Sequence, residues 1–281
     1  MKQFDLKRFG HLLKYHFSVT GPTWLRILGV YTIVLFLVSL FNTRVKGIDY
    51  TTALENNDIE FLYTMYADQI RQTALFGEFF LFIAMLFGAA NIFSHLKSKP
   101  QRSTYLTLPA SNLEKYLVSF LHAVVLLCVG TILAYCVADT LRMLLDLMTG
   151  RIVVWGVPMY FSRFSNFDAP WLLPVWALGI LLYLHSVYIL GGTLFRKLKF
   201  LMTSFFVIIG FIFVMWAVYT TRDWIDWQEF PKSHNLVGEG VFHPLFYVFT
   251  ILSYLLTAFH YWLSYRIFCR MQVNNHKWLN V

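Results

Sequence analysis

The chain has 281 residues, of which 58% are hydrophobic and only 14% are charged, and it carries a net charge of +8. Soluble domains carry about 25% charged residues, so this composition excludes an ordinary soluble fold. The apolar residues come in blocks of about 20, the length that crosses the hydrocarbon core of a bilayer. The sequence therefore predicts an all-α polytopic membrane protein, whose positive charge reflects membrane topology rather than binding to nucleic acid.

Residues 3–17 are expected to form an amphipathic helix that lies in the membrane interface and precedes the first span. The apolar residues that share one face are Leu6, Phe9, Leu12, Leu13 and Phe17. Basic residues on the other sides would face anionic lipid head groups. Gly21 and Pro22 are expected to end this helix, so residues 1–22 form an N-terminal interfacial segment. The alternative is a cytosolic helix that packs on a partner protein.

Six apolar blocks predict six transmembrane helices, which form one membrane domain over residues 23–268. The predicted spans are residues 23–41, 74–94, 115–138, 170–191, 199–219 and 244–267. When basic residues at the adjoining span ends, such as Arg26 and Lys115, are included, the two terminal regions and the connections after spans two and four hold 15 of the 23 Lys and Arg residues, but only the acids Asp5 and Glu114. Basic residues concentrate on the cytoplasmic side of a membrane. Both termini, including a basic tail at residues 269–281, are therefore predicted to be cytoplasmic, in the inner (cytoplasmic) membrane of a cell.

The outer connections near residues 42–73 and 139–169 contain apolar residues at helical spacing. These residues are Ile59, Leu62, Tyr63, Tyr66 and Ile70 in the first connection, and Leu141, Leu144, Leu145 and Met148 in the second. The spacing predicts short amphipathic helices that cap the outer face of the membrane domain. A gate or a cargo contact at these helices is the alternative.

Glu78 is the ionisable residue inside a predicted span that calls for an explanation. It lies about one turn inside the outer end of span two. An acid at the bilayer centre costs roughly 2.5–3.5 kcal/mol on insertion scales. The surrounding Leu, Ile and Phe residues offset this cost at roughly 0.3–0.6 kcal/mol each, so the span still inserts. Glu78 is a candidate for a polar conduit, and the alternative is a carboxylate that reaches the outer interface.

Residues 94–115 form a polar, basic stretch between two apolar blocks. Pro100 is expected to stop the preceding helix, because the residue before a proline avoids the helical region. Pro109 keeps the next helix from starting early. Ser111 and Glu114 have the S-x-x-E spacing of a capping box, in which each side chain accepts a hydrogen bond from the other residue's amide. The stretch is therefore predicted to be a short structured turn that fits into a pocket on another protein.

The sequence contains no motif for nucleotide hydrolysis or for metal binding. It has no G-x-x-x-x-G-K-[ST] loop, no H-E-x-x-H, no G-x-S-x-G and no Cys/His ligand spacing. His122, His185 and His260 lie on different predicted helices, and we interpret them as hydrogen-bonded packing residues. The three cysteines give no disulfide framework. We therefore expect no catalytic residue, no metal site and no enzymatic activity in this chain.

The six spans, the interfacial N-terminal helix and the structured connection before span three resemble the ABC-2 family of ABC transporter permeases. Many members of that family carry a Thr-Pro-x-Ser-x-x-Glu run at this place, and residues 108–114 here are Leu-Pro-Ala-Ser-Asn-Leu-Glu. Pro109, Ser111 and Glu114 match the run, whereas Leu108 replaces the threonine. The family's upstream Glu and Gly-Thr-Leu-Glu pattern is absent. The run looks like that of the divergent ABC-2 permeases of Bacteroidetes.

This resemblance implies that two permease copies, identical or different, pair with two separate ABC ATPase subunits. ATP and Mg²⁺ would bind to the ATPase, and this chain would hold no cofactor. Residues 95–110 would be the coupling helix, with Tyr105 and Leu106 buried in a groove of the ATPase and Arg102 paired with an acid at the rim. The other contact residues implied are Lys97, Lys99, Pro109, Ser111 and Glu114.

The expected function is therefore that of a permease subunit in an ATP-driven transporter, with export as the expected direction. Two other functions are alternatives. One is a membrane scaffold or sensor that transports nothing, and the other is an intramembrane enzyme that uses the scattered His and Glu residues.

Overall fold

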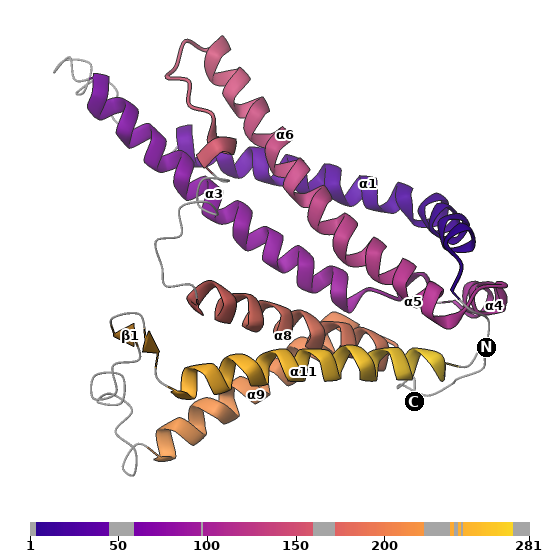
Figure 1. The fold of residues 1–281 in the computed structure, drawn as a ribbon. Coiled ribbons are helices and arrows are strands. Elements are labelled where there is room, and N and C mark those ends of the chain that lie inside the picture. The colour runs from indigo at the N-terminus through magenta and orange to yellow at the C-terminus, as the bar shows by residue number, and fades with distance from the viewer. Residues whose placement is uncertain are drawn as a thin grey trace. The chain divides into compact units, whose positions relative to one another are not determined.

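The computed structural model describes residues 4–44, 59–96, 98–159, 172–221, 237–238, 241–242 and 244–271, which are almost entirely helical (Figure 1). The long helices are α1 (Leu6–Arg44), α3 (Ile59–Ala90), α6 (Leu127–Met148), α8 (Leu172–Leu194), α9 (Lys199–Thr221) and α11 (Pro244–Cys269). The short helical elements are the 3-10 helix η1 (Ser94–Leu96), α4 (Lys99–Thr107), α5 (Asn112–Phe120) and the π-helix η2 (Leu121–Leu126). Strands β1 (Val237–Gly238) and β2 (Val241–Phe242) form a small antiparallel pair.

Several helical segments of the described chain are long and apolar enough to cross a membrane. There are five of them: Leu6–Arg44, Tyr63–Leu96, Asn112–Met148, Leu172–Leu194 and Lys199–Thr221. The chain is therefore an all-helical, multi-pass membrane protein, as the composition predicts. Helix α11, with 26 residues, covers the sixth predicted span, and the count of six stays a prediction.

The predicted end of the N-terminal helix at Gly21 and Pro22 is wrong. Helix α1 runs from Leu6 to Arg44 with Pro22 inside it, so the first residues are the opening turns of a 39-residue helix. A proline removes one N–H donor from a helix, but the bonds of the neighbouring turns persist. Long apolar helices tolerate proline for this reason, because unwinding would expose further backbone groups.

The outer amphipathic helices are not separate elements either, because each is continuous with a predicted span. Helix α3 is 32 residues long, and the helical segment Asn112–Met148 is 37 residues long. At 1.5 Å per residue these lengths are about 48 and 55 Å, more than the roughly 30 Å of a hydrocarbon core. No proline interrupts either stretch, so nothing in the sequence stops the helix at the membrane boundary.

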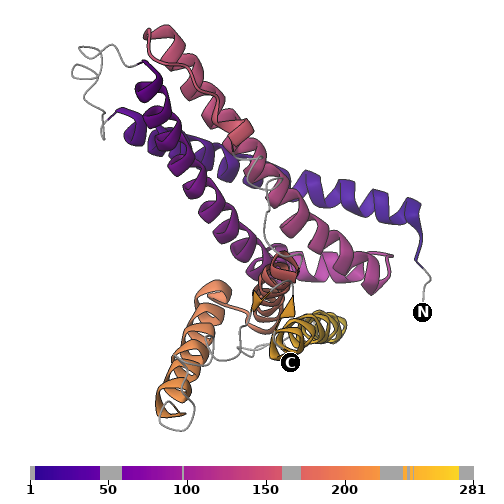
Figure 2. The same cartoon turned by 60° about the vertical axis from the view of Figure 1, so that its left-hand side comes forward.

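The chain divides into two compact units. The first comprises Met1–Leu13, Leu86–Ala123 and Ala169–Val281, and the second comprises Lys14–Met85 and Val124–Asp168. Within the first unit, α8 and α11 lie side by side, whereas α9 diverges from α8 (Figures 1 and 2). Gly192 at the end of α8 permits a close approach to α3, because a Cβ there would lie 2.5 Å from the carbonyl oxygen of Ala90.

Helices α1, α3 and α6 supply the core of the second unit. Its main cluster contains the buried residues Leu35, Ala74, Tyr135 and Ala138. A second cluster contains Tyr66 and Ile70 of α3 together with Val154, which follows α6. The two clusters pack buried apolar residues of α3 against α1, α6 and the segment that follows α6.

Candidate functional site

Helix α4 is a short polar helix between two long apolar ones, and its first turn is capped. Ser98 has an extended backbone (φ −89°, ψ 151°), and its Oγ accepts a hydrogen bond from the Gln101 amide at 3.3 Å. The Gln101 side-chain oxygen accepts in return from the Ser98 amide at 3.4 Å. Pro100 lies in the first turn, where its missing N–H costs little. The S-x-x-Q spacing that marks this capping box was present in the sequence but was not recognised.

Helix α5 begins at the predicted capping box, and this prediction is confirmed. The Ser111 Oγ accepts from the Glu114 amide at 3.2 Å, and the Glu114 Oε2 accepts from the Ser111 amide at 2.8 Å. The two bonds satisfy backbone donors that the first turn of a helix leaves without partners. Helix α5 therefore starts at a fixed residue, directly after the connection from α4.

The Glu114 carboxylate is completely buried and joins the N-terminal segment to the start of α5. Its Oε1 accepts from the Asp5 amide at 2.8 Å and from the Arg8 Nη2 at 2.6 Å, while its Oε2 accepts from the Arg8 Nε at 2.8 Å. Such two-point binding of a carboxylate by arginine is among the stronger hydrogen-bonded pairs in proteins. The expected contact between Glu114 and a partner protein is thus corrected, because its oxygens are occupied within the chain.

Tyr105 packs α4 onto α5. Its side chain is buried, its hydroxyl donates to the Lys115 carbonyl oxygen at 2.9 Å, and it lies 3.2 Å from the Ser119 hydroxyl. The ring of His95 meets the Tyr105 ring edge-on, with 4.6 Å between the centroids. The expected insertion of Tyr105 into a partner's groove is therefore also corrected, since the ring fills the chain's own core.

Arg102 and Lys115 fix α4 through two backbone carbonyl groups. The Arg102 Nη2 donates to the Leu96 carbonyl oxygen at 3.2 Å, and the Lys115 Nζ donates to the Leu106 carbonyl oxygen at 2.8 Å. Both side chains are buried. Burial lowers the pKa of Arg102, and the positive charge of Arg196 acts in the same direction. Arg102 thus holds η1, which corrects its expected pairing with an acid on a partner.

The face of α4 that remains open is polar. Its exposed side chains are Lys99, Pro100, Gln101, Thr104 and Thr107. The buried side chains lie on the opposite face at helical spacing, so α4 has one side packed on its own chain and one side available for contacts.

The remaining residues predicted for the site are distributed differently. Pro109 is exposed, whereas Leu106 and Ser111 are half-buried. Lys97 lies outside the described residues. Glu78 is half-buried on α3 and belongs to the second unit, so it does not form part of the cluster around α4.

A buried charge cluster in the second unit was missed by sequence reasoning. Arg142 is completely buried, and its guanidinium lies 2.8 Å from the carboxylates of both Asp139 and Asp146. It also donates to the Val154 carbonyl oxygen at 2.7 Å and to the Tyr66 hydroxyl at 3.3 Å. The two aspartates lie three residues before and four residues after the arginine, which is the usual spacing for ion pairs on a helix. This spacing is the feature of the sequence from which the cluster could have been predicted.

The two aspartates of this cluster have further hydrogen-bond donors. Asp139 accepts from the amides of Gly156 and Val157 at 2.8 and 3.0 Å. Asp146 accepts from the Tyr66 hydroxyl and faces Arg44 at 3.5 Å. Two carboxylates and two guanidinium groups therefore meet, which balances the buried charge. The arrangement ties α1, α3 and α6 together, which is a structural function.

Two of the three histidines interpreted as packing residues, the buried His185 and the half-buried His260, make side-chain hydrogen bonds, in agreement with that interpretation. The His185 Nδ1 lies 2.7 Å from the Tyr261 hydroxyl, and the His260 Nδ1 lies 3.1 Å from the Ser186 hydroxyl. Both contacts join α8 to α11. Within the described residues, no group of three or more His, Cys, Asp or Glu side chains is arranged to hold a metal ion.

Comparisons with known proteins add no family to this description. No protein-family model matches the chain, and neither curated proteins nor solved structures match it.

Proposed function

We propose that this chain is the permease subunit of an ATP-driven exporter that resembles the ABC-2 family, and that residues 95–110 couple it to a separate ATPase. In this proposal two permease copies assemble with two ATPase subunits, which bind ATP and Mg²⁺. The six spans and the cytoplasmic termini follow from the apolar blocks and from the distribution of Lys and Arg. The proposal requires a multi-pass, all-helical fold, and the chain has such a fold.

The observation that carries the proposal is the construction of α4. A helix of nine residues is too short to be stable alone, yet α4 is capped at its start and packed along one side. Tyr105 and Lys115 connect it to α5, which opens the 37-residue helical segment Asn112–Met148. A force on α4 would therefore act on the start of a membrane-spanning helix through these two hydrogen bonds.

The contact surface for the ATPase is the exposed polar face of α4, in place of the buried Tyr105 and Arg102. Gln101, Thr104 and Thr107 offer hydrogen-bonding groups, and Lys99 adds a positive charge at the start of the helix. A face of this kind contributes orientation and specificity at the rim of an interface more than raw affinity. The affinity would then depend on further contacts along the cytoplasmic side.

The proposal is tested by purifying the tagged chain from its native host in mild detergent and measuring vanadate-sensitive ATP hydrolysis. The wild type should carry an ABC ATPase, identified by mass spectrometry, and should hydrolyse ATP. Thr104→Arg places a large charged side chain on the exposed face of α4, and it should remove most of the ATPase.

The matched control is Thr64→Arg, which makes the same change at an exposed position on α3, in the predicted outer part. It should retain the ATPase and the hydrolysis. If the wild type carries no ATPase, the proposed function is wrong, and a scaffold or sensor becomes the better reading. If Thr104→Arg behaves like Thr64→Arg, the coupling surface is not α4.

A further inference from the structure

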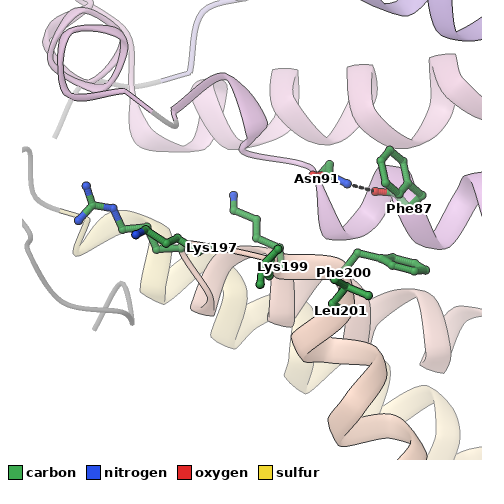
Figure 3. Close-up of a pocket in the computed structure, with 8 residues that line it drawn as sticks. Phe87, Asn91, Lys197, Lys199, Phe200 and Leu201 are labelled. Carbon is green, nitrogen blue, oxygen red and sulfur yellow. Dashed lines mark hydrogen bonds between the residues drawn. The ribbon is translucent and has the colours of Figure 1, made fainter.

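A pocket of about 670 Å³ opens at the turn between α8 and α9, on the side of the end of α3 (Figure 3). All of its lining residues belong to the first unit. The residues that line it are Phe87, Asn91, Arg196, Lys197, Leu198, Lys199, Phe200 and Leu201. The pocket thus combines a polar, basic end in the turn with an apolar end on two helices.

The basic end has three cations within four consecutive residues and no acid among the lining residues. Arg196 is half-buried and Lys197 is exposed, whereas Lys199 is buried, with 8% of its surface exposed. The Lys199 ammonium donates to the Phe93 carbonyl oxygen at 3.2 Å, which fixes its position against the segment that follows α3. Cations that line the same pocket favour an anionic ligand, because each of them attracts negative charge.

The backbone of the turn that carries these cations adopts an uncommon conformation. Leu198 has a φ of 47°, in the left-handed region that non-glycine residues rarely adopt. The chain reverses there between Leu194, the last residue of α8, and Lys199, the first residue of α9. Strained backbone of this kind concentrates at binding sites, where the surrounding structure maintains it.

The apolar end continues onto the exposed surface of α9. Leu198 and Leu201 are 60% and 61% exposed, and Phe87 is 43% exposed. Beyond them, the outward side chains of α9 are large and apolar, among them Phe205, Ile208, Ile209 and Ile212. A ligand in this pocket therefore meets positive charge at one end and a continuous apolar helix face at the other. This pairing of chemistries fits a phospholipid and does not fit a small soluble anion.

We propose that this pocket binds the head group of an anionic glycerophospholipid, with an acyl chain lying along the exposed face of α9. The phosphate lies among Arg196, Lys197 and Lys199, as basic pockets between membrane helices bind anionic head groups on the cytoplasmic side. Phe87, Phe200 and Leu201 contact the first part of the acyl chain. This inference rests on the membrane character of the chain and not on the proposed transporter function.

The test measures lipid binding to the full-length protein in detergent after extensive removal of native lipid. The probes are phosphatidylglycerol, phosphatidylcholine with the same acyl chains, and soluble glycerol 3-phosphate. Native mass spectrometry counts bound lipid, and thermal unfolding reports the stabilisation. Phosphatidylglycerol should bind and raise the unfolding temperature, whereas the other two probes should do neither at the same concentration.

The variant Arg196→Gln/Lys197→Gln removes two charges from the pocket and leaves the buried Lys199 in place. It should weaken phosphatidylglycerol binding by about 30-fold. Each basic residue near an anionic lipid surface increases the affinity by about five- to sixfold, so the loss of two multiplies to about 30-fold. The matched control Arg71→Gln/Arg270→Gln removes the same charge from exposed positions outside the pocket, on α3 and just after α11, and should bind as the wild type does.

Four results would overturn the proposal. Equal stabilisation by phosphatidylcholine would mean that the charges play no part, and equal stabilisation by glycerol 3-phosphate would make this a soluble-anion site. An equal loss in the Arg71→Gln/Arg270→Gln control would mean that lipid binding responds to net charge and not to this pocket. A pocket variant that keeps its lipid but changes its oligomeric state would assign this face to a second copy of the chain.

Discussion

Replacing Arg142 with methionine tests whether the buried charge cluster holds the second unit together. The change keeps a long, flexible side chain but removes five hydrogen bonds that the guanidinium makes. Asp139 and Asp146, which are 4% and 0% exposed, would then be buried without their shared cation. Removing one partner of a buried ion pair costs about 3–5 kcal/mol, because the other charge is left uncompensated.

The structure places the expected cost toward the lower end of this range. Asp139 keeps its two backbone amide donors, and Asp146 keeps the Tyr66 hydroxyl and the more distant Arg44. We therefore expect a loss of about 3 kcal/mol in the free energy of unfolding. For a chain of this size, each kcal/mol lowers the Tm by about 2–4 °C, so the Tm should fall by about 6–12 °C.

The assay is thermal unfolding in detergent, followed with a thiol-reactive fluorescent dye that reports the exposure of the half-buried Cys128 and Cys136 on α6. Arg71→Met is the matched control, because Arg71 pairs with Asp68 at 3.2 Å but both side chains are 62% exposed. An exposed pair contributes about 1 kcal/mol at most, so the control should shift the Tm by no more than about 4 °C.

A triple variant separates the loss of charge balance from the loss of packing. Arg142→Met combined with Asp139→Asn and Asp146→Asn removes the cation and both anions together. It should recover much of the stability, since a buried ion cluster can be replaced by neutral groups at little net cost. The reasoning is refuted if Arg142→Met unfolds at the same temperature as Arg71→Met.

Three further predictions follow from the positions of single residues. Tyr105→Phe removes the hydroxyl that reaches the Lys115 carbonyl oxygen and should destabilise the purified chain by about 1–2 kcal/mol; an unchanged Tm would mean that Tyr105 is not an internal anchor. In a variant without native cysteines, an impermeant thiol reagent applied to intact cells should label Thr64→Cys and miss Ser98→Cys, and labelling of Ser98→Cys would overturn the orientation. Glu78→Gln should reduce transport at normal expression if Glu78 lines a conduit, whereas full transport would favour its place at the outer interface.

The sequence was sufficient where a structural feature depends on residues within one turn. Ser111 and Glu114 are three residues apart, and the donors and acceptors of their capping box lie within the same turn. Their spacing alone therefore predicted where α5 begins. The apolar blocks predicted the membrane-spanning character for the same reason, since insertion depends on the composition of one continuous segment.

Helix ends were harder to predict, because a break depends on what lies around the helix. Pro22 was expected to end the first helix, but an apolar environment makes it costly to expose the backbone, and the helix continues. The outer part of α3 was predicted to be a separate amphipathic helix from the helical spacing of its apolar residues, which lie among acidic ones. Charge at a helix surface does not stop the hydrogen-bond ladder, so α3 continues beyond the predicted membrane boundary.

Residues that are buried by distant partners could not be assigned from the sequence. Tyr105 and Arg102 occur in a short basic stretch, where an exposed aromatic ring and a guanidinium resemble contact residues for another protein. Their true neighbours are α5 and η1, and only folding brings these elements onto α4. For Arg142, the spacing on one helix indicates its pairing with the two aspartates. Its contacts with Tyr66 and Val154 come from other segments, and the sequence does not indicate them.

The pairing of Arg8 with Glu114 has a consequence for how the chain is made. The two residues are 106 positions apart, so Arg8 leaves the ribosome well before its carboxylate exists. At a synthesis rate of about 5–20 residues per second, the opening turns of α1 are made roughly 5–20 s before Glu114. During that interval the opening turns of α1 lack their hydrogen bonds to the start of α5. The contact of Arg8 with Glu114 can thus form only when the third apolar block has begun to leave the ribosome. A chain released before that point would lack this contact of its N-terminal turns.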